Sequence, residues 1–136
     1  MKFNEAADSA VKEYTELIIA AAKVYKFDID IDAEFSEITD KTGKNYASSS
    51  TIISEIGVVV VFPDFKKKTA TAAPYNIGLA RAMEMEGYTE KYIESEGRVF
   101  GALLPITQTN AEVLAYFLTH KINPIKPDST SRKTTA

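Results

Sequence analysis

The chain has 136 residues, 45% of them hydrophobic and 26% charged, with a formal net charge of −3, one histidine (His120) and no cysteine. This length and composition are typical of a single globular domain. The lack of cysteine excludes disulfides, thiolate metal sites, iron–sulfur clusters and a cysteine nucleophile, and one histidine excludes a multi-histidine metal site within one chain.

Residues 4–26 form the first predicted element, a helix. Its apolar residues recur at three- and four-residue steps, which is the spacing of one helix face. These residues are Ala7, Val11, Tyr14, Ile18, Ala21 and Tyr25. Asn4 is a suitable N-cap. Leu17, Ile19 and Ala20 widen the apolar surface beyond that face, which favours contact with a second partner and therefore self-association.

Residues 27–38 follow as a predicted β-strand. Apolar and acidic side chains alternate at its start, and a strand places alternate residues on opposite faces. The apolar face would carry Phe27, Ile29, Ile31, Ala33 and Phe35, and the acidic row would consist of Asp28, Asp30, Asp32 and Glu34. The alternation therefore predicts a sheet with one face against a core and one strongly negative face in water.

A turn at residues 40–43 and a strand over residues 46–62 come next. Gly57 can bend that strand or divide it, and the continuous apolar run Val58–Phe62 predicts a strand that is covered on both faces. In a hairpin about the turn, the acidic row would lie opposite uncharged residues: Asp30 opposite Ile53, Asp32 opposite Thr51 and Glu34 opposite Ser49.

The acidic row allows three interpretations. Calcium needs roughly six to eight oxygen ligands, and alternate carboxylates on a strand start about 7 Å apart, so a metal site is disfavoured. The simplest interpretation is a solvated face that resists pairing with another sheet. The third is an interface in which the row meets a basic surface, on a partner or at Lys66, Lys67 and Lys68 of this chain.

The second half of the chain is predicted to be mainly helical. A polar connector over residues 66–72 leads to a helix from Pro74 to Gly87, and a short helix follows from Thr89 to Glu96. Residues 99–104 are short and apolar, as expected of a strand. Thr109 and Glu112 have the spacing of a capping box, which would open a last helix that ends near Lys121.

Two arginines, Arg81 and Arg98, lie within the predicted fold. A guanidinium group binds phosphate or carboxylate through two parallel hydrogen bonds. A pocket for an anionic or nucleotide-like ligand would therefore use Asn76, Arg81 and Arg98, with Tyr75 or Tyr88 stacking on the ligand. The alternative for each arginine is an intramolecular salt bridge to a nearby glutamate, which is the commoner use of a lone arginine beside acids.

The end of the chain differs in composition from the rest. Residues 121–136 carry four basic side chains and one acidic one, whereas residues 1–62 carry six basic and eleven acidic ones. Residues 123–136 are too polar to offset their ordering entropy by burial. We expect one domain over residues 1–122 and a basic tail over residues 123–136 that is disordered or docks on a neighbour.

Together these elements predict an α+β fold in one domain. A small antiparallel sheet, made of residues 27–38, 46–62 and 99–104, would pack against three to four helices. No apolar stretch reaches the ~20 residues that span a bilayer, and the first residues lack a signal-like hydrophobic region. We therefore expect a cytoplasmic protein without a membrane partner.

The predicted function follows by elimination. Glycine-rich phosphate motifs and a nucleophile elbow are missing from the sequence, so we expect no catalytic residues, no cofactor and no enzyme. The chain is predicted to be a homo-oligomeric binding or assembly protein, such as an adaptor or a structural component. One alternative is a module that captures an anionic or nucleotide-like molecule. The other is a nucleic-acid-binding protein that acts through Lys66–Lys68 and the basic tail.

Overall fold

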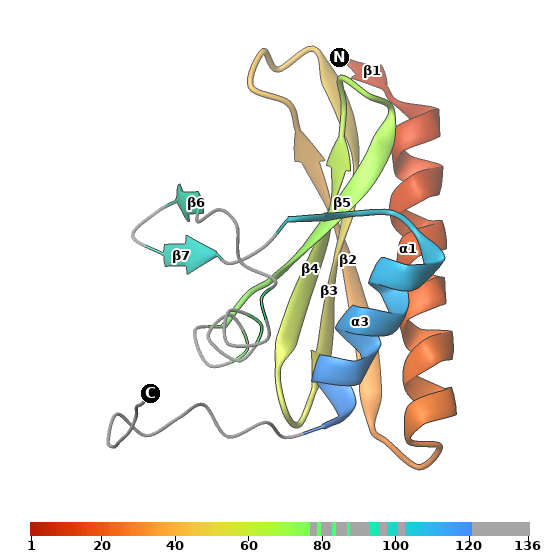
Figure 1. The fold of residues 1–136 in the computed structure, drawn as a ribbon. Helices are drawn as coiled ribbons and strands as arrows, with labels where there is room; N and C mark the ends of the chain where they lie inside the picture. Colours follow the sequence, from red (N-terminus) through yellow and green to blue (C-terminus); the bar gives the residue numbers. More distant parts are fainter. Residues whose placement is uncertain are drawn as a thin grey trace.

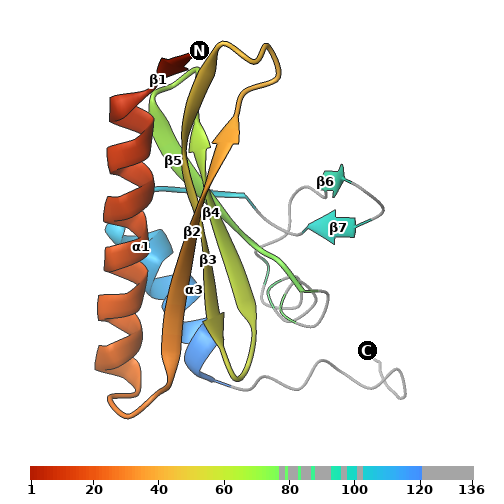
Figure 2. The same ribbon diagram turned by 180° about the vertical axis from the view of Figure 1, so that it is seen from behind.

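The protein is seen here in a computed structural model, which describes residues 1–76, 79, 83, 87, 93–95, 98–100 and 103–120. Its elements in chain order are β1 (Lys2–Phe3), α1 (Glu5–Tyr25), β2 (Ile31–Thr39), β3 (Asn45–Ser54), β4 (Val58–Asp64), β5 (Thr69–Pro74), β6 (Ile93–Ser95), β7 (Arg98–Phe100), β8 (Leu104–Pro105) and α3 (Gln108–Thr119). Figures 1 and 2 show α1 and α3 together on one face of the main sheet.

The main sheet has six strands and is mixed. Strands β2, β3, β4, β5 and β8 lie side by side in antiparallel pairs. The short strand β1 runs parallel to β3 and pairs with its first two residues. Strands β6 and β7 form a separate two-stranded ribbon. The expected fold class is therefore corrected: the α+β character holds, but the sheet is larger and mixed, and the structure describes two helices rather than three to four.

Helix α1 confirms the helix that was predicted over residues 4–26. The Asn4 side-chain carbonyl accepts a hydrogen bond from the Ala7 N–H at 3.1 Å, and so caps the first turn as expected. Glu5 and Asp8 lie in the first turn and Lys23 in the last, an order that suits the helix dipole.

Strand β2 is shorter than predicted, because residues 26–30 are needed to turn the chain from α1 back to the sheet. Asp28 and Asp30 therefore precede the strand, and Phe27 is 84% exposed rather than part of the apolar face. Ile31 and Ala33 pack against the core, whereas Phe35 is 51% exposed.

The β2–β3 hairpin also has a different register. Asp32 lies opposite Ile53, and Glu34 lies opposite Thr51, which is a shift of two residues from the predicted pairs. The turn is longer than expected. The Asp40 carboxylate stabilises it by accepting hydrogen bonds from the Thr42 hydroxyl and the Asn45 side-chain amide, both at 2.7 Å. A shift of two keeps every side chain on its predicted face.

Strand β5 was predicted as a polar connector. Thr69–Pro74 pairs with β4 along its whole length, and Ala70 and Ala72 are fully buried. Alanine and threonine give a weak hydrophobic alternation, so the strand is specified by its place beside β4 rather than by its composition.

The predictions for the later elements are corrected in part. Ile93–Ser95 is a strand where a short helix was expected, and the predicted strand over residues 99–104 is divided between β7 and β8. The N-cap of α3 is Thr107, whose hydroxyl accepts the Asn110 N–H at 2.9 Å. The predicted capping box at Thr109 is therefore wrong. Most of the predicted helix from Pro74 to Gly87 lies outside the described residues.

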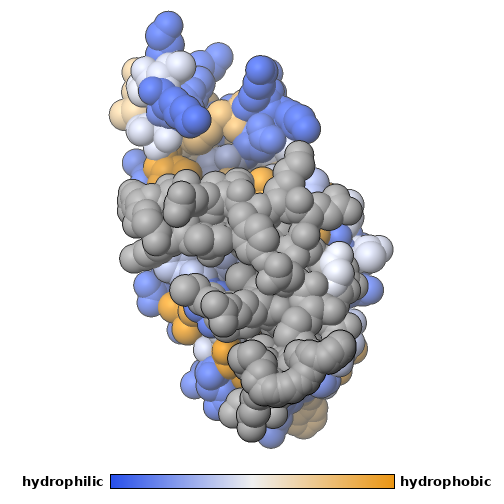
Figure 3. Space-filling view, turned by 60° about the vertical axis from the view of Figure 1, so that its left-hand side comes forward, coloured by the Kyte–Doolittle hydropathy of each residue, from blue (hydrophilic) through white to orange (hydrophobic). Residues whose placement is uncertain are grey.

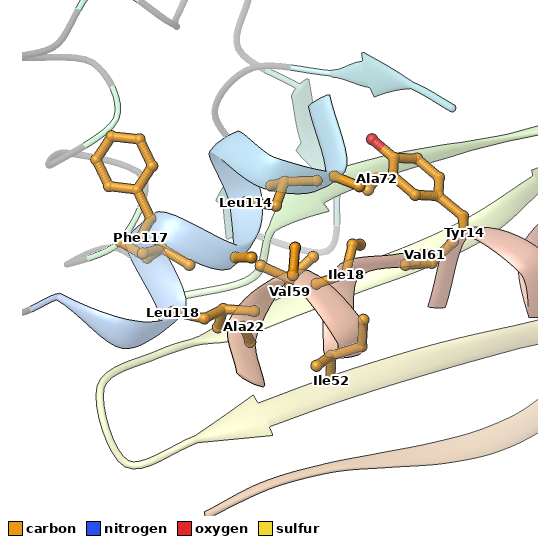
Figure 4. Packing of buried hydrophobic residues seen from close by; sticks show 14 of the residues in the cluster. Tyr14, Ile18, Ala22, Ile52, Val59, Val61, Ala72, Leu114, Phe117 and Leu118 are labelled. Carbon is orange, nitrogen blue, oxygen red and sulfur yellow. The ribbon is translucent and has the colours of Figure 1, made fainter. Parts of the chain in front are cut away.

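The core lies between the two helices and the sheet, as Figure 4 shows. Helix α1 contributes Tyr14, Ile18 and Ala22, the sheet contributes Ile52, Val59, Val61 and Ala72, and α3 contributes Leu114, Phe117 and Leu118. In β4 the run of apolar residues alternates in burial. Val59 and Val61 are fully buried against the helices, and Val58, Val60 and Phe62 on the other face are half-buried.

Neither α1 nor α3 combines the length and the apolar composition that crossing a bilayer requires. The predicted tail, residues 123–136, lies outside the described residues. The division into a domain over residues 1–122 and a tail therefore stays a prediction.

Candidate functional site

The predicted anion pocket is described only at two of its residues. Tyr75 and Asn76 directly follow β5, whereas Arg81 and Tyr88 lie outside the described residues, and Arg98 is described only in its backbone, within β7. The Asn76 side-chain oxygen accepts the Val58 N–H at 3.0 Å. Asn76 therefore stabilises the start of β4, and the pocket as a whole stays a prediction.

The acidic row is exposed along its whole length. Asp28 and Asp30 lie in the loop before β2. Ile31 and Ala33 pack against the core, so Asp32 and Glu34, which alternate with them, lie on the sheet face opposite to α1 and α3. Asp32 accepts a hydrogen bond from the Ala33 N–H at 3.1 Å. Within the part of the chain that the structure describes, no three His, Asp or Glu side chains come together in a way that could hold a metal ion.

Lys66, Lys67 and Lys68 are exposed in the turn between β4 and β5. The turn is fixed locally, since the Asp64 carboxylate accepts the Lys67 N–H at 2.9 Å. Asp32 lies level with the start of β4, and the lysines follow its end, so the two groups are about 20 Å apart along the strand. Figure 3 shows hydrophilic residues at the end of the molecule that carries the β2–β3 and β4–β5 turns. A contact between the acidic row and the lysines would therefore need a second copy.

The titratable groups with shifted pKa values serve the fold. Hydrogen bonds from Asn45 and Thr42 hold the pKa of Asp40 well below its ordinary value. Burial acts to raise the pKa of Asp8, but hydrogen bonds from Ser48 and the nearby Lys12 ammonium lower it overall. Burial raises the pKa of Tyr14, whose hydroxyl donates to the Leu104 carbonyl at 2.8 Å. Each of these groups joins one structural element to another.

The serines of β3 lie in an interior strand of the main sheet. Ser50 faces α1, where its hydroxyl lies 2.6 Å from that of Thr15. Ser54 donates to the Leu118 carbonyl at 2.8 Å. These buried hydroxyl groups therefore hold the two helices against the sheet.

An open groove lies on the outer side of the helices, and we call it the helix groove. It has a volume of about 390 Å³ and is lined by Leu17, Ala20, Ala21, Val24 and Tyr25 of α1 and by Gln108 and Glu112 of α3. Val24 in its lining is 85% exposed, and Phe27 just past the end of α1 is 84% exposed. Two large apolar side chains near the end of α1 are therefore open to solvent.

An aromatic cluster lies where the ends of α1 and α3 meet. Tyr116 and His120 stack with ring centroids 4.1 Å apart, and Tyr25 meets both rings edge-on at 5.8 Å. The His120 Nδ1 lies 2.9 Å from the Thr119 hydroxyl and 3.0 Å from the Tyr116 carbonyl oxygen. The cluster packs the end of α3 against the end of α1.

Sequence reasoning found only part of the helix groove. It identified Leu17 and Ala20 as apolar residues outside the core stripe, but it did not connect them with Val24. The spacing of three and four residues from Leu17 through Ala20 to Val24 was the available signal.

No known protein family, curated protein or solved structure matches this chain.

Proposed function

We propose that this chain is a non-enzymatic, homo-oligomeric binding or assembly protein. The observation that supports the proposal is the apolar surface at the second half of α1, where Val24 lines the helix groove and is almost fully exposed, as is Phe27 just past the end of the helix. Exposed apolar patches on a small protein usually become buried in a complex. We place the protein in the cytoplasm, a location with which a chain without cysteine is compatible.

The chemistry of the polar groups also favours binding over catalysis. Asp8, Asp40 and Tyr14 have shifted pKa values, and the hydrogen bonds that accompany these shifts join parts of the fold. Catalytic groups are usually shifted where they meet a substrate cleft. The helix groove has a mainly apolar lining, which suits a packing partner.

Light scattering coupled to size-exclusion chromatography tests this proposal. A stable multimer at micromolar concentration supports it, and a monomer at every concentration contradicts it. Native mass spectrometry of the purified protein covers the alternatives in the same sample. A co-purified anion would favour the pocket at Asn76, Arg81 and Arg98, and co-purified nucleic acid would favour Lys66–Lys68 and the tail.

The acidic row and the lysine turn are a proposed second contact between copies. Because Asp32 and Lys67 lie at opposite ends of one sheet, two copies related by a two-fold axis would pair Asp32 of each with Lys67 of the other. Such a contact weakens steeply with salt. Assembly that keeps its size in Asp32→Asn with Glu34→Gln, at low and high salt, would remove this contact from the proposal.

A further inference from the structure

The outer face of α1 carries apolar and charged residues in an order that is complementary to itself. We infer that this face binds α1 of a second copy, with the two helices antiparallel and a two-fold axis level with Ala20. The inference rests on the proposed homo-oligomeric function, and it adds where the copies meet and in which orientation. The face is accessible, because α1 forms an outer layer of the described structure in both ribbon views (Figures 1 and 2).

The apolar part of the contact follows from helix geometry. A helix has about 3.6 residues per turn and rises about 1.5 Å per residue. Leu17 and Val24 therefore lie on the same flank of Ala20, one below it and one above it. In an antiparallel pair centred on Ala20, Leu17 of each copy lies level with Val24 of the other. This flank borders the helix groove, so an exposed Val24 gains apolar neighbours there.

The charged part of the contact selects the orientation. Glu16 and Lys23 lie on the opposite flank of Ala20, and both are exposed. Antiparallel packing places Glu16 of each copy beside Lys23 of the other, which gives two ion pairs by symmetry. Parallel packing would instead place the flank of Glu16 and Lys23 against the flank of Leu17 and Val24, so both charges would face apolar side chains without a partner.

These charges are available for a partner. Within the described residues Glu16 has no ion pair, since the two that occur join Lys12 to Asp8 and Lys26 to Glu55. The Lys23 ammonium donates one hydrogen bond, to the Ile29 carbonyl at 3.2 Å. An ammonium has three N–H groups, so two remain for Glu16 of the second copy.

Ala20 suits the centre of such a pair. It is exposed and has a small side chain, and helices with small residues at their contact approach toward the lower end of the usual 8–10 Å between axes. At that separation two copies of residue 20 come within the range that a disulfide can bridge. The natural chain has no cysteine, so one introduced thiol reports on this position alone.

The first experiment compares Ala20→Cys with Ser9→Cys under mild oxidation. Ser9 is exposed and lies on the same outer face of α1. In the antiparallel pair its two copies would be about 33 Å apart, from the rise per residue. We expect a covalent dimer for Ala20→Cys, at least about tenfold more abundant than for Ser9→Cys. Equal yields for the two variants, or a higher yield for Ser9→Cys, would overturn the inference.

The second experiment exchanges the charges. Glu16→Lys and Lys23→Glu should each raise the dissociation constant of the dimer about tenfold, because each replaces two attractive pairs by two repulsive ones. The double variant restores both pairs with reversed sign and should return to within about threefold of the wild type. A double variant as weak as the single ones would overturn the pairing.

The outcomes for the two claims are distinguishable. A wild-type chain that is a monomer at every concentration contradicts the proposed function and the inference together. A different outcome is a wild-type multimer in which Ala20→Cys and Ser9→Cys give equal yields of covalent dimer, and in which Glu16→Lys and Lys23→Glu leave the dissociation constant unchanged. This outcome leaves the proposed function in place and removes only this interface. Circular dichroism of each variant confirms that a loss of assembly is not a loss of fold.

Discussion

The hydroxyl oxygens of Thr15 and Ser50 lie 2.6 Å apart at the buried contact between α1 and β3. The Thr15 hydroxyl donates to the Val11 carbonyl at 2.8 Å, so it accepts its second hydrogen bond from Ser50. This pair fixes how far α1 lies along the sheet, and thus which residues of α1 remain on the outer face.

Thr15→Val tests this contact, because valine keeps the shape of threonine and leaves the Ser50 hydroxyl without its partner. We expect the free energy of unfolding in urea to fall by about 1–3 kcal/mol. The double variant with Ser50→Ala removes both polar groups and should cost less than the sum of the two single variants. Additive costs would show that the two hydroxyl groups do not act as a pair.

The lowered pKa of Asp8 predicts how the free energy of unfolding depends on pH. Its pKa in the folded state lies below its ordinary value, so its contribution is present above the unfolded pKa of about 3.9 and is lost as the pH falls through the folded pKa. Asp8→Asn should therefore show a smaller loss of stability between about pH 7 and pH 3 than the wild type.

The matched control for Asp8 is Asp28→Asn, which changes an exposed carboxylate in the loop before β2. Urea unfolding at both pH values should give the same acid-induced loss for this variant as for the wild type. If Asp8→Asn lost as much stability in acid as the wild type, the hydrogen bond from Ser48 and the contact with Lys12 would not be what stabilises the ionised form.

A substitution at Gly43 in the β2–β3 turn tests backbone conformation without a change in packing. Its φ is +73°, and a Cβ added there would meet no heavy atom within 4 Å. Gly43→Ala should lower the free energy of unfolding by about 1 kcal/mol for conformational reasons alone. Gly43→Asn should lower it less, because asparagine tolerates this conformation better. Equal costs for the two variants would contradict this reasoning.

The Asn76 side-chain oxygen of the predicted anion pocket accepts a hydrogen bond from the Val58 N–H at 3.0 Å. Asn76→Ala removes the acceptor for the Val58 N–H and should cost about 1–2 kcal/mol in urea unfolding, whereas Asn76→Asp keeps an acceptor oxygen and should cost less. An alanine variant as stable as the wild type would show that the hydrogen bond from the Val58 N–H does not stabilise the fold. A thermal shift with nucleotides in the wild type would then support the pocket.

Some elements could be predicted from the sequence because their signal is local. The apolar stripe and the Asn4 cap define α1, and the alternation around Ile31 defines the faces of β2. Other features depend on contacts between distant residues. The burial of Ala70 and Ala72 in β5 depends on the neighbouring β4, and the start of β2 depends on the space needed to turn back from α1.

The exposed apolar surface at the second half of α1 was predicted incompletely for the same reason. The sequence shows that Leu17 and Ala20 are apolar, but exposure depends on where α3 and the sheet cover α1. The acidic row is distinct in the sequence because acidic and apolar residues alternate there, but this spacing does not determine what the row contacts. Val24 was missed because an apolar residue near the end of a helix is more often part of a core.

The most direct test of self-association through the outer face of α1 is the molar mass of Val24→Glu in light scattering, beside the wild type and Ser9→Glu. Val24 and Ser9 are both exposed, so neither change should unfold the chain. The wild type and Ser9→Glu should have at least twice the 15.0 kDa mass of one chain, and Val24→Glu should have that of a monomer. A monomeric wild type, or a Val24→Glu variant that assembles like the wild type, would contradict the account.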